Sequence, residues 1–291
     1  MNSDYMWSLL FGSGEAVKKF EDMWAMKTNW ETLDVERKLR GFPPLSTLEK
    51  SLLRRPKFRI GMYKSYVIKH HPSLAENMMT KVFWHHVFYE NNIPQPRMHA
   101  TCIGGHLTTY TAEDDESPTG YIVKPNKGSL GRGVERATAC PDCNRGSDWV
   151  CQERVVNCGE YTEHYRVVTL WDGRVFSVSL MQSGVPGAVT SNLSQGGTSE
   201  MLCFGNGCHL AYPDAVREIS EKLATMHTEG FNVVFSIGWD VIVACDPDGN
   251  PGRAFALEGN LMNNGKQWSK EANDAYRNDL KRFLAMHPEY L

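Results

Sequence analysis

The feature that most constrains the fold is the segment 238–260, in which two apolar runs flank a central cluster of turn-forming residues. This pattern predicts an antiparallel β-hairpin. We expect Cys245 to lie roughly opposite Arg253 across it. In that register Asp240 lies opposite Glu258, where cross-strand side chains are about 5 Å apart. The sequence therefore predicts two carboxylates that converge at one end of the hairpin.

Asn260 extends this acidic group, because it follows Glu258 by two residues and so shares a face of the strand. Two carboxylates and an amide offer hard oxygen atoms, and Mg²⁺ takes few protein carboxylates together with phosphate oxygens and water. The ordinary alternative is a hairpin with solvated acids at its rim. An unpaired charge at the end of an apolar strand is costly, which favours a metal site.

A second polar cluster follows the predicted strand 121–123 and occupies the loop 126–134. Its glycines free the backbone to turn and expose several N–H groups, which can surround an anion. The cluster consists of Lys124, Lys127, Gly128, Ser129, Gly131, Arg132 and Gly133. We predict a triphosphate site, and an ordinary glycine-rich hairpin is the alternative. The loop matches neither the Walker pattern nor the dinucleotide fingerprint.

Helical and strand-like patterns alternate along the rest of the chain. Helices are predicted at 15–26, 72–92 and 212–228, and strands at 121–123, 149–151, 166–170, 175–180 and 240–244. Mixed strands and helices in this order predict an α+β fold.

The charge of the chain gives no general attraction to nucleic acid, because 31 Lys and Arg residues face 34 Asp and Glu residues, for a net charge of -3. Any anion must therefore be bound at a local basic site. No apolar stretch approaches the roughly 20 residues that span a bilayer, and the first residues lack a basic leader. We expect a cytoplasmic protein with no membrane span and no nucleic-acid partner.

The eight cysteines are scattered, and in a large chain of this kind we expect reduced thiols. Cys140 and Cys143 have metal-like spacing and, together with Cys151 and Cys158, allow a four-thiolate zinc site. The alternative is a turn that bears two thiols. The missing CxxC spacing in the second pair favours that alternative.

The order of these segments, with Gln152-Glu153 between the glycine loop and the acidic hairpin, resembles the ATP-grasp superfamily over about residues 75–268. Gly238-Trp239-Asp240 and Glu258-Gly259-Asn260 are most similar to the sugar-transfer-associated and glutamate-ligase-like carboxylate-amine ligases. The resemblance implies two α+β subdomains that clasp ATP, over 72–153 with the glycine loop and 154–291 with the metal site. A helical N-terminal region over 1–71 precedes them.

The resemblance also implies roles for single residues. The ATP-binding set becomes Lys81, Lys124, Lys127, Gly128, Ser129, Gly131, Gly133, Glu153, Val155, Val156 and either Glu160 or Glu163. Within this set Glu153 would meet the adenine amino group, and Glu160 or Glu163 the ribose. Asp240, Glu258 and Asn260 would bind Mg²⁺, and Arg166 and Lys266 would face the transferred phosphate or the substrate carboxylate.

One departure lies in the segment 191–197, which resembles an Asn-x-x-x-Gly-Gly pattern of glutamate-ligase-like members. Those members carry an arginine just before the asparagine. Here Thr190 and Ser191 stand in its place, so the resemblance does not extend to that phosphate contact.

The implied reaction is an ATP- and Mg²⁺-dependent ligation. ATP phosphorylates a substrate carboxylate to an acylphosphate, and an amine acceptor then displaces phosphate. The carboxylate would belong to a small molecule or to a glycoconjugate or polysaccharide precursor. Two alternatives are a small-molecule kinase that phosphorylates a hydroxyl and a non-catalytic nucleotide-binding protein.

Overall fold

The computed structural model describes residues 30–39, 41, 43–47, 50, 71–110, 119–128, 131–144, 146–191, 193–205, 212–246, 248–261 and 268–287. The helix predicted at 15–26 lies outside these residues. The chain divides into two compact units, Met1–Leu74 with Trp268–Leu291, and Ala75–Gln267. In the first unit α3 (Trp30–Leu39) contacts α9 (Lys270–Met286), whose N-terminus is capped by the Ser269 hydroxyl.

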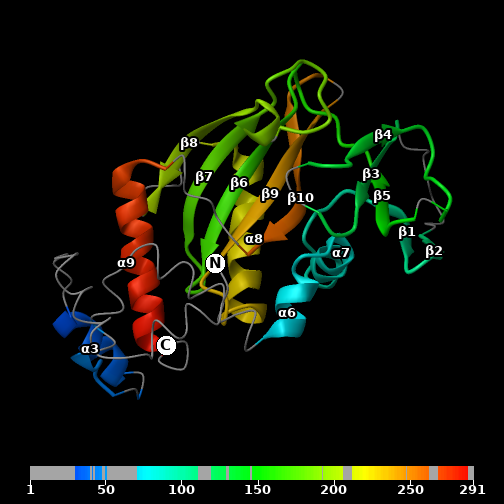
Figure 1. Cartoon of the computed structure of the whole chain (residues 1–291). Coiled ribbons are helices and arrows are strands. Elements are labelled where there is room, and N and C mark those ends of the chain that lie inside the picture. The colour runs from blue at the N-terminus through cyan, green and yellow to red at the C-terminus, as the bar shows by residue number, and fades with distance from the viewer. Residues whose placement is uncertain are drawn as a thin grey trace. The chain divides into compact units, whose positions relative to one another are not determined.

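The second unit contains two antiparallel five-stranded sheets (Figure 1). The first, in the order β2-β1-β5-β3-β4, consists of β1 (Met98–Ile103), β2 (His106–Thr109), β3 (Tyr121–Pro125), β4 (Glu135–Ala137) and β5 (Trp149–Glu153). The second, in the order β10-β9-β6-β7-β8, consists of β6 (Glu163–Leu170), β7 (Val175–Gln182), β8 (Thr198–Phe204), β9 (Ser236–Cys245) and β10 (Pro251–Asn260). The predicted α+β class is confirmed.

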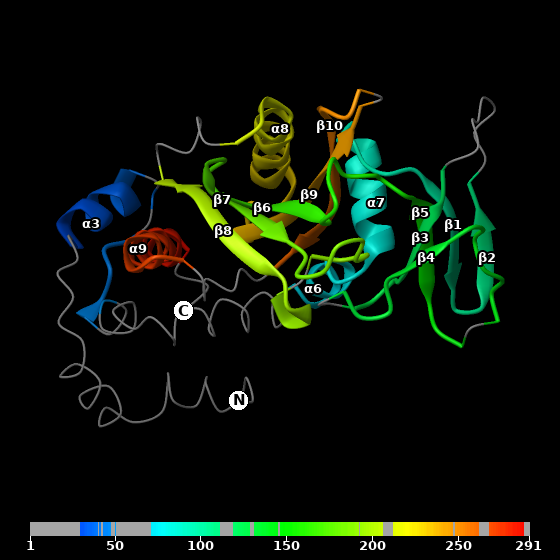
Figure 2. The same cartoon turned by 90° about the horizontal axis from the view of Figure 1, so that it is seen from above.

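Helix α8 (Asp214–Gly230) covers one face of the second sheet (Figure 2) and contacts β6, β9 and β10. Its apolar residues recur at helical spacing, so that Val216, Ile219 and Leu223 form one buried stripe. Beneath the stripe, β9 is buried from Ser236 to Val243. Burial on both faces and pairing with β6 and β10 hold the position of Asp240 on this strand.

The single helix predicted over 72–92 is wrong, because two helices occupy this stretch: α6 (Pro72–Asn77) and α7 (Lys81–Glu90). Thr80 separates them in an extended conformation, and its hydroxyl accepts a hydrogen bond from the Phe83 amide. Thr80 also forms a β-bridge with Lys127 of the glycine loop. The break therefore allows the loop to reach the start of α7.

No helix among the described residues is long and apolar enough to cross a membrane.

The predicted hairpin is formed by β9 and β10, and Asp240 lies opposite Glu258 as expected. The prediction that Cys245 faces Arg253 is wrong, because Cys245 pairs with Pro251. Two register shifts in β10 explain the difference, one between Pro251 and Ala254 and one between Ala256 and Glu258. Each bulge adds a residue to one strand, and such insertions leave no clear mark in an alternating sequence pattern.

Helix α7 packs against the acidic end of this hairpin through two tryptophans. The rings of Trp84 on α7 and Trp239 on β9 meet edge to face, with centroids 5.1 Å apart. Gly259 lies against both rings, since a Cβ atom there would come within 2.6 Å of Trp84 and 2.7 Å of Trp239. The glycine between Glu258 and Asn260 is therefore required by packing.

The expectation of reduced cysteines is wrong, and so is the alternative of a zinc site. Disulfides join Cys102 to Cys143, Cys140 to Cys151 and Cys158 to Cys245, and Cys203 is also disulfide-bonded. Cys140 and Cys143 thus pair with two different strands, β5 and β1, across Cα separations of 5.8 and 5.5 Å that suit a disulfide. Spacing along the chain did not reveal this, because the partners are set by the sheet.

We predict that Gly259→Ala destabilises the protein by about 1–3 kcal/mol, since the added methyl group overpacks the site between two buried rings. Denaturant unfolding followed by tryptophan fluorescence measures the change. Gly230→Ala at the end of α8 is the matched control, because a Cβ atom there meets nothing within 4 Å. Equal stability of the two variants would contradict the packing role of Gly259.

Candidate functional site

The basic side of the site begins at β3, which ends in Lys124-Pro125 and leads into the glycine loop. The side chain of Lys124 is buried. The next residue but one, Asn126, is also buried and accepts hydrogen bonds on Oδ1 from the amides of Lys81 and Val82, each at 3.1 Å. Asn126 therefore fixes the start of the loop to the N-terminus of α7.

Lys81 is the first residue of α7 and connects the loop with the hairpin. Its Nζ donates to the carbonyl of Gly128 at 3.3 Å and lies 3.4 Å from Glu258 Oε2. Both contacts come from a side chain that is 9% exposed. Trp84, one turn further along α7, packs against the hairpin. This packing positions the helix so that Lys81 lies beside Glu258.

The acidic side of the site is built around Asp240. Arg166 on β6 donates from Nε to Asp240 Oδ1 at 2.5 Å and from Nη2 to Oδ2 at 3.2 Å. Asn260 donates from Nδ2 to Oδ2 at 3.4 Å. His164 Nε2 lies 3.3 Å from Oδ1, close enough for an ion pair but without hydrogen-bond geometry. Burial by itself raises the pKa of Asp240, but the charges of Arg166 and His164 outweigh burial and hold that pKa below its usual range.

The two sides act on each other electrostatically at Lys124. Burial lowers the pKa of Lys124 from 10.5 to about 8. The negative charge of Glu258 opposes this shift, Lys81 adds to it, and Asp240 opposes it again. The first sheet thus places a buried lysine within electrostatic reach of both hairpin acids.

The rest of the glycine loop is only partly described. Gly131 and Gly133 have φ of 67° and 71°, a conformation in which glycine is favoured. Lys127 is directed to α6, where its Nζ lies 2.9 Å from Glu76 Oε1. Both of these side chains are more than half exposed, so water weakens the pair. Ser129 lies outside the described residues.

The predicted base-binding and ribose-binding residues run from Glu153 at the end of β5 to Glu163 at the start of β6. Glu153 Oε1 accepts a hydrogen bond from the Arg97 amide at 2.9 Å, and Glu163 Oε1 accepts one from Gln182 at 2.6 Å. Glu160 is exposed, and so is Val156, whereas Val155 is partly buried. Their predicted contacts with a nucleotide stay predictions.

Of the two residues predicted to face the transferred phosphate, Arg166 lies in the site and Lys266 lies outside the described residues. Sequence reasoning missed His164 and the role of Ser191, whose hydroxyl lies 2.5 Å from His164 Nδ1. His164 and Arg166 are two residues apart on β6 and therefore share a face. Because Arg166 was already a candidate, the two-residue spacing could have identified His164 from the sequence.

The donor atoms fit a magnesium ion that shares its ligands with phosphate. Asp240, Glu258 and Asn260 offer two carboxylates and an amide from one hairpin, and Mg²⁺ completes such a set with phosphate oxygens and water. Among the described residues no group of three or more His, Cys, Asp or Glu side chains could hold a metal ion by itself. The donor set therefore suits a shared ion better than a closed structural site.

No protein-family model and no curated protein sequence matches the chain. Solved structures are similar at low identity. D-cycloserine synthetase DcsG is 13% identical with a TM-score of 0.49, over 90% of this chain and 94% of that one. The ATP-grasp ligase PsnB, complexed with minimal precursor, Mg and ADP, is 14% identical with a TM-score of 0.45, over 88% and 76%.

A D-alanine–D-alanine ligase from Bacillus anthracis complexed with ATP is 13% identical with a TM-score of 0.43. The match covers 74% of this chain and 66% of that ligase. The chain therefore spans about two thirds of the length of that protein.

We predict a pH-dependent contribution of Lys124 to stability. Its pKa is about 8 in the folded state, against 10.5 for an unperturbed lysine, so between these values the unfolded chain binds more protons and stability rises with pH. The free energy of unfolding of the wild type, minus that of Lys124→Met, should rise by about 3 kcal/mol from pH 7 to pH 11.

Urea unfolding at a series of pH values measures this difference. Lys127→Met is the matched control, because the pair with Glu76 raises the pKa of Lys127. A raised lysine pKa gives stability that is present below about 10.5 and lost above it, which is the opposite trend. A difference that stays flat for Lys124→Met between pH 8 and 10.5 would refute the prediction.

Proposed function

We propose that the chain is an ATP- and Mg²⁺-dependent carboxylate–amine ligase whose two sheets form the halves of an ATP-grasp fold. The halves would correspond to residues 72–153 and 154–291. The observation that carries the proposal is the meeting of Lys81 and Lys124 with Glu258 and Asp240, which come from α7, β3 and the β9–β10 hairpin. Cations suited to phosphate and acids suited to a metal ion are the two things that a triphosphate site needs.

Lys81 and Lys124 would bind the phosphates of ATP. Both side chains are buried, and a positive charge acts more strongly on phosphate where water is excluded. Backbone amides of the glycine loop, at Gly128, Gly131 and Gly133, would add neutral donors. Lys127 and Ser129 complete the proposed phosphate set.

The segment between β5 and β6 would bind the nucleoside. Glu153 and the backbone of Val155 or Val156 would contact adenine, and Glu160 or Glu163 the ribose. The exposure of Val156, at 43%, is consistent with an apolar surface that a flat base covers. Burying such a surface under a base is favourable.

Asp240, Glu258 and Asn260 would hold Mg²⁺, which when bound neutralises charge that develops on the transferred phosphoryl group. To do so, Asp240 must release Arg166, which now donates to both of its carboxylate oxygens. A released Arg166 would then be free to bind the phosphoryl group or the substrate carboxylate. Lys266 would assist it.

In the proposed reaction a carboxylate oxygen of the substrate attacks the γ-phosphorus, and ADP leaves as the bond to its β-phosphate oxygen breaks. An amine then attacks the acyl carbon of the acylphosphate, the bond from that carbon to the phosphate oxygen breaks, and the proton lost by the amine leaves with inorganic phosphate as the amide forms. The role of Lys81, Lys124 and Arg166 is to stabilise negative charge in both steps. We propose a small-molecule or glycoconjugate carboxylate as the substrate, in line with the resemblance to sugar-transfer-associated proteins.

We predict that Glu258→Gln lowers ATP turnover by about 100-fold or more, because an amide replaces one of the two charged metal ligands and removes the negative charge that pairs with Lys81. Phosphate release measures turnover, and circular dichroism checks the fold. Asp172→Asn is the control, since Asp172 pairs with Arg174 on the β6–β7 turn and has no proposed role. Undiminished turnover in Glu258→Gln would contradict the metal role.

We predict that ligation yields one ADP and one inorganic phosphate for each amide formed. Incubation with ATP, Mg²⁺ and a panel of amino acids and uronic acids, scored by mass spectrometry and phosphate release, tests this. A phosphorylated hydroxyl with no free phosphate would instead identify a kinase. Tight ATP binding without any turnover across the panel would favour a non-catalytic nucleotide-binding protein.

A further inference from the structure

The segment that joins the two sheets, residues 154–162, contains no regular secondary structure. It follows Glu153 at the end of β5 and precedes Glu163 at the start of β6. Such a segment is expected to be adaptable unless other contacts fix it. Val155 and Val156 near its start, together with Glu153, are the proposed base-binding residues.

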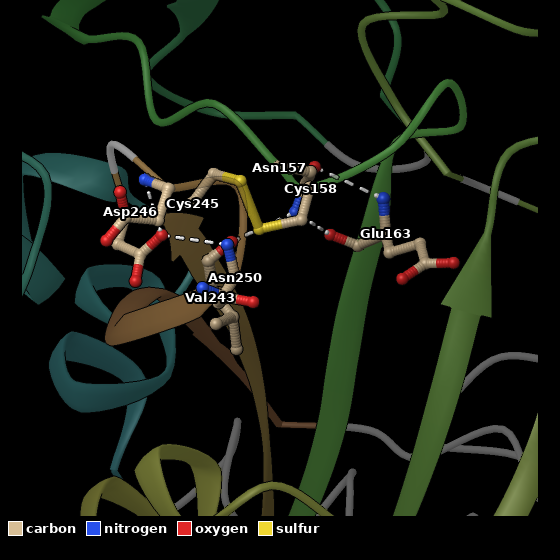
Figure 3. Close-up of a disulfide and its surroundings, with 8 residues drawn as sticks. Asn157, Cys158, Glu163, Val243, Cys245, Asp246 and Asn250 are labelled. Carbon is tan, nitrogen blue, oxygen red and sulfur yellow. Dashed lines mark hydrogen bonds between the residues drawn. A yellow bond between two sulfur atoms is a disulfide. The ribbon is translucent and has the colours of Figure 1, made fainter.

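Three contacts fix this segment to the end of β9, and Figure 3 shows the disulfide among them. The Cys245 amide donates to the carbonyl of Val156 at 2.8 Å, and Asn157 Nδ2 donates to the carbonyl of Val243 at 3.2 Å. Cys158 forms a disulfide with Cys245, with their Cα atoms 4.9 Å apart. A covalent bond thereby joins two positions that are 87 residues apart.

Asn157 also organises the segment internally. Its Oδ1 accepts from the Glu163 amide at 3.2 Å, and its Nδ2 donates to the Glu163 carbonyl at 3.0 Å (Figure 3). One side chain thus connects the segment with β6 as well as with β9. These hydrogen bonds act on the same stretch of backbone as the disulfide does.

The strand that receives the disulfide also carries Asp240. Cys245 and Asp240 lie five residues apart on β9, which pairs with β10 over this stretch and with β6 as far as Val241. Five residues of an extended strand span about 17 Å at 3.3–3.4 Å per residue. The disulfide therefore connects the segment with the acidic site through a single hydrogen-bonded strand.

We propose that the Cys158–Cys245 disulfide is a positioning element of the nucleotide site, which holds the base-binding segment in register with the strand that carries Asp240. This inference rests on the proposed function. Without the disulfide the segment keeps its hydrogen bonds, each of which contributes little net stability. Binding a base would then require ordering the segment, which lowers affinity.

The consequence is specific to the base. Inorganic tripolyphosphate has the phosphates of ATP but no base, so it needs the cations and Mg²⁺ ligands but not the segment. We expect the double variant Cys158→Ser, Cys245→Ser to bind Mg·ATP about tenfold more weakly. Its affinity for Mg·tripolyphosphate should remain within about twofold of the wild type. Isothermal titration calorimetry measures both affinities.

A purely structural role would lower both affinities together, so their ratio is the informative quantity. The matched control is Cys102→Ser, Cys143→Ser, which removes a disulfide of the first sheet and should leave the ratio unchanged. Asn157→Ala provides a second variant that keeps the disulfide and loosens the same segment. It should lower ATP affinity less than the double variant does and spare tripolyphosphate, and reduction of the folded wild type decides the matter where the double variant fails to fold.

Reduction of the wild type tests the same point without mutation. Dithiothreitol gives two electrons and two protons to the disulfide, which becomes two thiols, and leaves as its own cyclic disulfide. Peptide mapping with alkylation identifies the opened disulfide. Opening of Cys158–Cys245 should weaken Mg·ATP binding to the level of the double variant.

Parallel loss of both ligands, or an unchanged ATP affinity in the double variant and in Asn157→Ala, would overturn the inference. A map of the oxidised protein in which Cys158 and Cys245 are not linked would also overturn it. A wild type that binds neither ligand would instead refute the proposed function on which the inference rests. A wild type that prefers ATP, with variants that keep this preference, refutes the inference alone.

Discussion

Two ion pairs occupy the centre of the unit Ala75–Gln267, one between Lys81 and Glu258 and the other between Arg166 and Asp240. Each joins residues far apart in sequence, and the side chain of Asp240 is only 12% exposed. A charge withdrawn from water is tolerated when a partner compensates it. Folding must therefore bring α7, β6 and the β9–β10 hairpin together before these charges are satisfied, so the contacts that complete the fold also assemble the candidate site.

The same ion pairs determine which ligands the site can bind together. If Mg²⁺ and a triphosphate bind as we propose, the metal ion takes the acids and the phosphates take the cations, so every charge exchanges one partner for another. Neither ligand alone gives this result, because Mg²⁺ alone would leave Arg166 and Lys81 without their acids, and the triphosphate alone would leave the acids uncompensated. Buried charges without partners are costly, which favours joint binding of metal and nucleotide.

Local sequence patterns were enough to predict most strands and the hairpin, because alternation of apolar residues and turn-forming residues specify these elements. The meeting of Asp240 with Glu258 and the α+β class were predicted on that basis. The break before α7, the two bulges in β10 and the partners of the cysteines were not, since each depends on contacts between distant segments. His164 was missed for a related reason, because its importance comes from Asp240, which lies on another strand.

The disulfides differ in what surrounds them, and this separates their roles. Cys102 and Cys151 belong to a buried cluster of the first sheet that also contains Ala100, Val123 and Trp149, with Cys140 and Cys143 packed against it. Both disulfides of this sheet therefore reinforce its core. The Cys158–Cys245 disulfide lies instead beside the exposed Val156, at a junction held by hydrogen bonds. Both of its cysteines are only partly buried, so its main effect is to fix the position of the segment. Disulfides persist in oxidising surroundings, whereas the sequence analysis expected reduced thiols, so the cysteines do not support the prediction of a cytoplasmic protein.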